Sequence, residues 1–165
     1  MGMFTECQGE LIRALKAAGC EREPFLSLKN MQLSAESRIS AVLCEEELVE
    51  RDSGKKSYTA AGGERLKRCK LYSRNITYTV IIGDYEQVRA EQTYEKFLEE
   101  LATGIYVDGN YVAIEPSEAQ WMGEKDHILQ AKVAVQLKVS CQGGLYQDNR
   151  MGKITDVKTE IRKGD

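Results

Sequence analysis

Apolar and polar positions alternate over two long stretches of the chain. From Leu129 to Cys141 almost every second residue is apolar, and the residues between them are mostly Gln, Lys and Ala. A strand with one buried and one solvated face is typical of an antiparallel sheet. Leu66–Ile82 alternates in the same way and is rich in β-branched and aromatic residues. We therefore predict two long antiparallel strands, and Gly143-Gly144 is expected to close the one that runs from Leu129 to Cys141.

Two other stretches place their apolar residues at helical spacing. The first begins with Thr5-Glu6-Cys7-Gln8, which has the form of a capping box, and Gly19 stands where a C-terminal glycine belongs. The second covers about Tyr85–Thr103, with Asp84 as its predicted N-cap and Gly104 as its end. The sequence therefore predicts two amphipathic helices.

Shorter signals complete the pattern. Ile39–Arg51 is predicted as a strand, although its Glu45-Glu46-Glu47 run would also suit a helix. Ile105–Ile114 predicts a hairpin that turns at Asp108-Gly109, since this dipeptide accepts the positive φ angles of a tight turn. Ile154–Ile161 offers a last, more polar strand. The order of elements predicts an α+β fold, an antiparallel sheet with two helices packed on one face.

Length and composition favour one domain. The 165 residues are 42% hydrophobic and 30% charged, which is ordinary globular usage. Glu21–Ser37 gives only a weak signal, and an edge strand and a connecting segment both remain open for it. Residues Asp52–Glu64 are rich in Gly, Ser, Lys and Ala without periodicity, and they predict a mobile loop. We expect a single domain over residues 1–165 with this loop at about 52–64.

Charge and hydropathy bear on the partners and the compartment. The net charge is −3 with both signs interspersed, so we expect no recognition of nucleic acid sequence. No run approaches the roughly 18 apolar residues of a spanning helix, so no membrane partner is expected. The N-terminus lacks the pattern of a signal peptide, which predicts that the chain stays where it is made.

The cysteines are odd in number and have no paired spacing. The five are Cys7, Cys20, Cys44, Cys69 and Cys141. A chain of this length does not need disulfide staples, so we expect reduced thiols. Cys44 and Cys141 lie on apolar faces of predicted strands, where they are expected to be buried as small hydrophobic residues.

Candidate chemistry is sparse. His127 is the only histidine, and neither a Cys-His pair nor a zinc set has the usual spacing. Ser53–Ser57 lacks the first glycine of a phosphate loop and predicts a solvated basic loop. The carboxylates at Glu45–Glu47 and Glu99-Glu100 resemble solubilising charges. We predict no catalytic, cofactor-binding or metal-binding residue and no cofactor, and expect a structural protein that is not an enzyme.

Aromatic side chains are the remaining singular feature. Tyr106, Tyr111 and Tyr146 lie near predicted turns or strand ends, and Trp121 lies in a polar segment. Amphipathic rings at such places suit ordinary packing or a contact between subunits.

Residues Asp84–Tyr146 resemble the phage tail terminator family, small proteins that close the head-proximal end of a tail tube. The resemblance is carried by the capped helix, Ile114-Glu115-Pro116, the Trp121–Asp126 segment, the long strand and a terminal Gly-Gly-Leu-Tyr. It extends to terminators of Gram-positive phages and of bacteriocin-like contractile tails. The first half departs from it, which leaves a tube, completion or connector subunit as an alternative, and a small ligand-binding or enzymatic domain as another.

The resemblance implies a ring, usually of six subunits, that stops tube polymerisation and docks to tail tube, sheath or neck proteins. It places the protein in the host cytoplasm during assembly and then in the virion or phage-tail-like particle. The family has no catalytic residues to carry over. We expect deletion of Asp52–Glu64 to leave the subunit folded and to weaken assembly.

The two strongest apolar stripes give an expectation for the core. Leu98 and Val135 stand at the middle of these stripes and are expected to be buried where the second helix crosses the sheet. Truncation of Leu98 to Ala is then expected to cost about 2–4 kcal/mol, and truncation of Val135 somewhat less.

The unpaired cysteine count leads to a first prediction. Excess reductant and a metal chelator should each leave the circular dichroism spectrum and the oligomer mass unchanged, because the thiols are structural. Loss of structure under either treatment would reveal a disulfide or a metal site.

Overall fold

The computed structural model describes residues 2–34, 38–59, 65–123 and 133–150. The chain forms two compact units. Unit 1 comprises Met1–Leu48 with Arg74–Gly143, and unit 2 comprises Val49–Ser73 with Gly144–Asp165. The expectation of a single domain stays a prediction.

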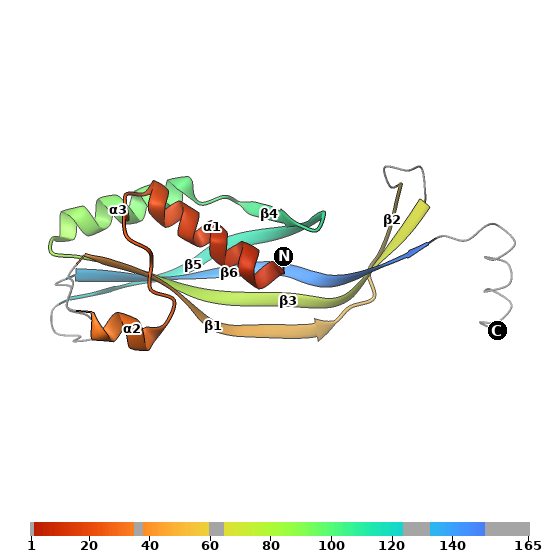
Figure 1. Cartoon of the computed structure of the whole chain (residues 1–165), viewed down its shortest axis with the longest axis horizontal. Coiled ribbons are helices and arrows are strands. Elements are labelled where there is room, and N and C mark those ends of the chain that lie inside the picture. The colour runs from red at the N-terminus through yellow and green to blue at the C-terminus, as the bar shows by residue number, and fades with distance from the viewer. Residues whose placement is uncertain (1, 35–37, 60–64, 124–132, 151–165) are drawn as a thin grey trace, which may run out of the picture. The chain divides into compact units, whose positions relative to one another are not determined.

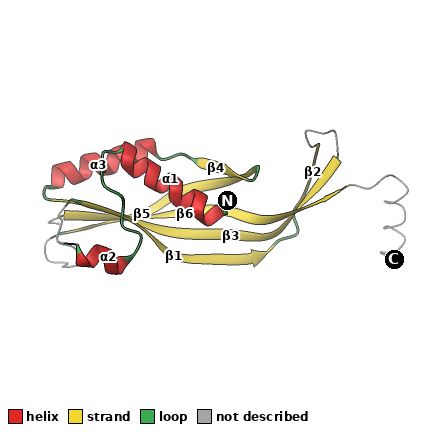
Figure 2. Cartoon of the chain, in the orientation of Figure 1, coloured by secondary structure: helices red, strands yellow, loops and turns green. Residues whose placement is uncertain are grey.

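The elements follow the predicted α+β class (Figure 2). The strand order is β1-β3-β6-β5-β4, and β2 pairs with β3. The described elements are α1 (Met3–Ala17), α2 (Leu28–Leu33), β1 (Ile39–Arg51), β2 (Lys55–Thr59), β3 (Arg65–Asp84), α3 (Gln87–Glu100), β4 (Gly104–Val107), β5 (Asn110–Met122) and β6 (Val133–Arg150).

One face of the sheet in unit 1 is covered by α1 and α3 (Figure 1). Every second residue of β3 from Ile76 to Ile82 points into this core, as do alternate residues of β6 from Val135 to Cys141. The side chains that α1 buries recur at helical spacing: Met3, Cys7, Leu11, Ala14 and Leu15. The predicted packing of two helices on one face is confirmed.

The opposite face carries a smaller apolar cluster under α2. Met31 of α2 is buried there with Ile39, Ala41, Ile81, Met122 and Ala134. Ser27 begins this helix by accepting a hydrogen bond from the Asn30 backbone N–H at 3.1 Å. The segment Glu21–Ser37, which has only a weak pattern, therefore contains a helix. This helix has six residues, too few to show a helical period in the sequence.

Helix ends differ from the predictions at three of four places. Helix α1 begins one turn before the supposed capping box, because Met3 is buried and Glu6 N–H already donates to Gly2 O. Helix α3 begins after Glu86, since Asp84 still belongs to β3. It ends at Glu100 rather than near Gly104, which begins β4. Only Gly19 was placed correctly, with φ at 107° just beyond α1.

Two strands are longer than predicted. Strand β5 continues through Pro116 to Met122, and its register with β6 shifts between Pro116 and Ala119. A proline fits there because β4 pairs with β5 only up to Ala113, so β5 forms a sheet edge beyond it. Strand β6 runs through Gly143-Gly144 to Arg150 instead of ending there.

The two glycines of β6 make room for close neighbours. A Cβ atom at Gly143 would lie 2.8 Å from the Met3 sulfur in unit 1. A Cβ atom at Gly144 would lie 2.6 Å from the Tyr72 carbonyl oxygen in unit 2. Within a strand, glycine can therefore signal close packing and not the end of the strand.

The segment predicted as a mobile loop contains β2. This strand pairs antiparallel with β3 from Lys55 opposite Cys69 to Thr59 opposite Arg65. Before it, Asp52 Oδ1 accepts a hydrogen bond of 2.8 Å from Gly54 N–H. Residues 60–64, the predicted strand Ile154–Ile161 and the start of the predicted 129–141 strand lie outside the described residues.

The tight turn between β4 and β5 was predicted correctly. Asp108 and Gly109 have φ angles of 50° and 80°, so both central residues take the left-handed conformation. The predicted strand Ile39–Arg51 is also confirmed as β1.

The expectation for Leu98 is wrong, whereas Val135 is fully buried as expected. Leu98 is 36% exposed, and the adjacent Phe97 is the large side chain that α3 buries completely. Phe97 and Leu98 are adjacent and both apolar, so the sequence does not specify which of them faces the core. Choosing the wrong one rotates the predicted buried face of the helix by 100°. Ala90 and Phe97, seven residues apart, define the buried side of α3.

We predict that Phe97→Ala lowers the free energy of unfolding by about 3–5 kcal/mol, since it opens a cavity in the core. Leu98→Ala should cost about 1 kcal/mol or less, because much of this side chain is already in water. Urea denaturation of both variants measures the difference. Equal losses would contradict the observed orientation of α3.

Candidate functional site

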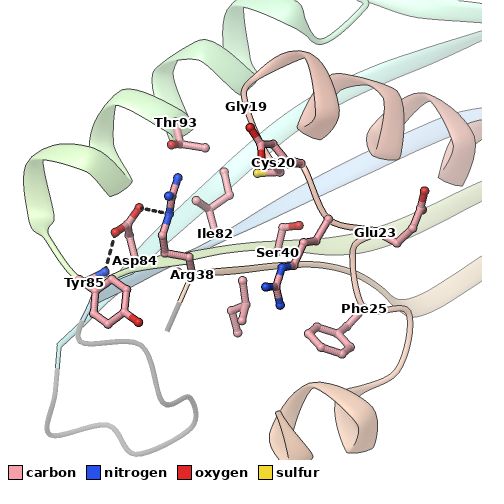
Figure 3. Close-up of a pocket in the computed structure, with 14 residues that line it drawn as sticks. Gly19, Cys20, Glu23, Phe25, Arg38, Ser40, Ile82, Asp84, Tyr85 and Thr93 are labelled. Carbon is pink, nitrogen blue, oxygen red and sulfur yellow. Dashed lines mark hydrogen bonds and ion pairs between the residues drawn. The ribbon is translucent and has the colours of Figure 1, made fainter. Parts of the chain in front are cut away.

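A pocket of about 600 Å³ lies in unit 1 where the end of α1, the start of β1, the end of β3 and helix α3 meet (Figure 3). Its wall includes three apolar side chains, Phe25, Ile39 and Ile82, together with several charged ones. The residues that line it are Gly19, Cys20, Glu21, Arg22, Glu23, Phe25, Arg38, Ile39, Ser40, Ile82, Gly83, Asp84, Tyr85 and Thr93.

Asp84 is the buried charge of this pocket, with only 4% of the residue exposed. Its Oδ1 accepts a hydrogen bond of 2.6 Å from the Tyr85 backbone N–H. Its Oδ2 lies 3.5 Å from Arg38 Nε and 3.9 Å from Arg89 Nε. Figure 3 shows the contact of Asp84 with Arg38, the residue before β1. Through Arg89, Asp84 also links the end of β3 to α3.

Cys20 is the one thiol in the pocket wall. Burial raises the pKa of this thiol, although a hydrogen bond with Ser40 and the charge of Arg38 act in the opposite direction. The raised pKa keeps the thiol protonated at neutral pH, whereas a nucleophilic cysteine needs its thiolate form. The surroundings of Cys20 therefore do not lower the pKa of its thiol, as activation of a nucleophile would require.

The charges of the pocket are mixed. The wall contains the carboxylates of Glu21, Glu23 and Asp84 and the guanidinium groups of Arg22 and Arg38. Asp84 lies against Arg38, whereas Glu23 pairs with Lys16. Within residues 2–34, 38–59, 65–123 and 133–150 no group of three or more His, Cys, Asp or Glu side chains is placed to hold a metal ion. Chemically, the pocket can accept a ligand or a side chain that has an apolar body and a polar end.

The other cysteines lie apart from the pocket. Cys7 and Cys141 are fully buried and share a hydrogen bond, which together with burial raises the pKa of the Cys141 thiol. The predicted burial of Cys141 is confirmed. Cys44 is exposed, contrary to the prediction, because β1 leaves the core after the half-buried Leu43. Cys69 is half-buried in unit 2.

Two carboxylates of the acidic run of β1 make hydrogen bonds to β3. Glu47 accepts two hydrogen bonds from Arg74, at 2.6 and 2.9 Å, which hold the pKa of its carboxyl below the ordinary value. Glu45 instead accepts a hydrogen bond of 2.5 Å from Thr79 Oγ1. Glu45 and Glu47 thus each have a structural partner on β3.

The carboxylates at the end of α3 also make local contacts. Lys96 Nζ lies 3.8 Å from Glu99 and 3.2 Å from Glu100, which are helical neighbours at i+3 and i+4. These two glutamates therefore pair with the cationic side chain of Lys96 on their own helix, as expected of surface charges.

An exposed aromatic pair lies on the β4–β5 hairpin. The rings of Tyr106 and Tyr111 stand opposite each other, 5.3 Å apart in an edge-on arrangement. Tyr106 is 74% exposed and Tyr111 is 48% exposed. A Cβ atom at Gly104 would lie 2.2 Å from the Tyr111 ring, so the glycine leaves the space that this ring occupies.

The remaining candidates are separate from this pair. Trp121 packs edge-on against Tyr94, with ring centroids 5.6 Å apart. In unit 2, Lys70 Nζ lies 6.0 Å from the ring centroid of Tyr146. His127 is outside the described residues, and Ser53–Ser57 leads into β2, where a phosphate loop would need a helix.

No protein-family model matches this sequence, and no curated protein is significantly similar to it. None of the helices in the described part of the chain is long and apolar enough to cross a membrane.

No pattern in the sequence predicted the pocket. Arg38 and Ser40 are far along the chain from Asp84, and none of the three belongs to a motif. Asp84 was predicted to cap a helix. The ion pair of Arg38 with Asp84 depends on the pairing of β1 with β3, which no local pattern specifies.

We predict that Asp84→Ala lowers the free energy of unfolding by about 1–3 kcal/mol, since it leaves a backbone N–H and a guanidinium group without their acceptor. Glu86→Ala is the control, because this exposed carboxylate makes no capping hydrogen bond to α3. Equal stability of the two variants would show that Asp84 does not hold the pocket together.

Proposed function

We propose that this protein is a structural subunit that assembles into a closed ring, of six copies, at the end of a phage or phage-tail-like tail tube. In this role it stops polymerisation of the tube and contacts the tube, with sheath or neck proteins as further partners. It acts in the host cytoplasm during assembly and remains in the finished particle. It is not proposed to be an enzyme.

The resemblance of Asp84–Tyr146 to tail terminators supports this function. Within that range the chain has helix α3, the β4–β5 hairpin, a proline in β5 and the long strand β6. The departures are α2 and the β2–β3 hairpin, for which the resemblance offers no counterpart. A tube, completion or connector subunit of the same kind of particle therefore remains the alternative.

The exposed pair of tyrosines is the observation that supports contact between subunits. Two large rings, Tyr106 and Tyr111, lie at the surface where they contact each other and leave much of their area in water. Tyrosine is enriched in protein interfaces, where a rigid ring gives large contact area and its hydroxyl stays hydrogen-bonded. A ring of identical subunits also needs two different contact surfaces on each copy.

The pocket favours a second candidate, a small ligand-binding domain. Its volume of about 600 Å³ lies within the range of small-molecule sites, and Asp84 is buried in its wall. The two candidates differ in solution, since a ring protein is a closed oligomer and a ligand-binding domain of this size is a monomer or dimer.

Electron microscopy of particles from a strain that lacks the gene tests the proposal. We expect tubes or sheaths of uncontrolled length, because nothing would cap the growing end. Tails of normal length with normal attachment would exclude a terminator.

We also predict that the double variant Tyr106→Ser, Tyr111→Ser assembles at least about tenfold more weakly, since exposed aromatic anchors dominate many interfaces. Its thermal unfolding should match that of the unmodified protein, because both rings are largely outside the core. Leu33→Ser, which removes an exposed apolar side chain of α2 away from the hairpin, serves as the control. Unchanged assembly of the double variant would rule out the tyrosine pair as a contact surface.

A further inference from the structure

We propose that the Tyr106 side chain of one subunit enters the Asp84 pocket of the next subunit, and that this contact joins the ring head to tail. The inference rests on the proposed function, because it assumes that copies of the chain associate. It names the two different surfaces that a ring of identical subunits requires, which are the β4–β5 hairpin and the pocket beside α3.

The β4–β5 hairpin presents Tyr106 as a projecting side chain. Tyr106 and Tyr111 are cross-strand partners, and Tyr106 is the more exposed of the two, at 74% against 48%. The Tyr111 phenol lies over Gly104, where a Cβ atom would be 2.2 Å from it. Gly104 thus lets Tyr111 lie close to the sheet, and Tyr111 supports Tyr106 edge-on with centroids 5.3 Å apart.

The pocket has the chemistry that the phenol of a tyrosine needs. Its three apolar side chains give surface for the body of an aromatic side chain (Figure 3). Asp84, 4% exposed, provides an acceptor for the hydroxyl at the polar end. Sites of about 600 Å³ hold small molecules that are larger than a phenol, so Tyr106 can enter while Tyr111 lies at the mouth.

The charges around Asp84 favour a neutral donor over a cationic one. Asp84 Oδ2 lies 3.5 Å from Arg38 Nε and 3.9 Å from Arg89 Nε, so two guanidinium groups already face this carboxylate. They would repel the amine of a lysine that entered the pocket. A phenol O–H has no net charge, and an ionised carboxylate has enough lone pairs to accept its hydrogen bond beside the one from Tyr85 N–H.

The two surfaces are too far apart to meet within one subunit. The pocket lies beside the N-terminal half of α3, whereas the hairpin follows the end of this helix and β4 continues away from it (Figure 1). With 14 residues, α3 is roughly 20 Å long. The hairpin is also held in place by the pairing of β5 with β6. The Tyr106 side chain that enters a pocket therefore comes from another copy, and repeated contacts of this kind run head to tail.

Separate variants of the two surfaces test the contact. Thr93→Phe adds a large side chain to the pocket wall, and Tyr106→Ser removes the side chain that docks (Figure 3). We expect each variant to weaken self-association at least about tenfold in sedimentation velocity, since aromatic side chains in pockets dominate many interfaces. Thr93→Val is the matched control, because it keeps the size of the side chain and loses only a hydrogen bond from Thr93 Oγ1 to the Arg89 carbonyl oxygen.

A mixture of the two variants tests whether these surfaces meet each other. Tyr106→Ser has an intact pocket and Thr93→Phe has an intact hairpin, so a single contact can form between them and no further copy can add. We expect a heterodimer of two 18.6 kDa subunits in the mixture, at a concentration where each variant alone is monomeric. A mixture without heterodimer, when the unmodified protein forms the ring, would contradict the contact.

Alkylation of Cys20 tests the contact without a change in the pocket. Cys20 is a half-buried thiol in the pocket wall, and Cys44 is an exposed thiol of β1 that serves as the internal control. At mildly alkaline pH, iodoacetamide should label Cys20 several times more slowly in the unmodified protein than in Tyr106→Ser, because the docked side chain covers the pocket. Labelling of Cys44 should be equal in the two proteins, as read by mass spectrometry of the same samples.

The outcomes separate this contact from the proposed function. A closed oligomer that tolerates both Tyr106→Ser and Thr93→Phe would overturn the contact and leave the ring intact. Weaker association of Tyr106→Ser with equal labelling of Cys20 in both proteins would place Tyr106 on another surface of its neighbour, which also overturns it. If circular dichroism shows that Thr93→Phe is unfolded, the labelling of Cys20 decides. A protein that is monomeric under all conditions would overturn the contact and the ring together.

Discussion

The apolar face of β3 and β6 has to be covered, and the architecture of unit 1 follows from this constraint. Ile76, Tyr78 and Val80 alternate with polar residues, so a single face of the sheet collects them. Helix α1 covers that face with five buried side chains, and α3 adds Phe97. The hydroxyl of Tyr78 in this core has a hydrogen-bond partner, since it donates to the Phe4 carbonyl oxygen at 2.9 Å. Helix α2 covers a smaller patch on the other side and leaves the rest of that face to polar residues.

The elements predicted correctly were those with a regular spacing of apolar residues or a characteristic turn dipeptide in their own sequence. Both long strands, both amphipathic helices and the Asp108-Gly109 turn have local patterns, and each exists in the structure. Helix α2 and strand β2 were missed because six and five residues are too few to establish a period. The predicted burial of Leu98 was wrong for a different reason. Phe97 and Leu98 are both apolar, and the sequence does not specify which of them α3 turns toward the core. The pocket around Asp84 had no local signal at all, since strand pairing creates it.

Packing and function place different demands on this chain. The core accounts for the buried residues of α1, α3 and the sheet, and it gives no reason for Tyr106 and Tyr111 to lie in water. Association between copies would explain the exposed tyrosines, because it would bury their rings. The proposal of a ring thus rests on surface features that the fold itself does not require.

The mass of the purified, full-length protein in solution tests this account most directly. Native mass spectrometry, checked by sedimentation velocity, distinguishes a closed assembly from a distribution of open ones. The account predicts one closed species whose mass is a whole multiple of the 18.6 kDa subunit, with six copies expected. A monomer at every concentration, with no larger species at low salt, would contradict it.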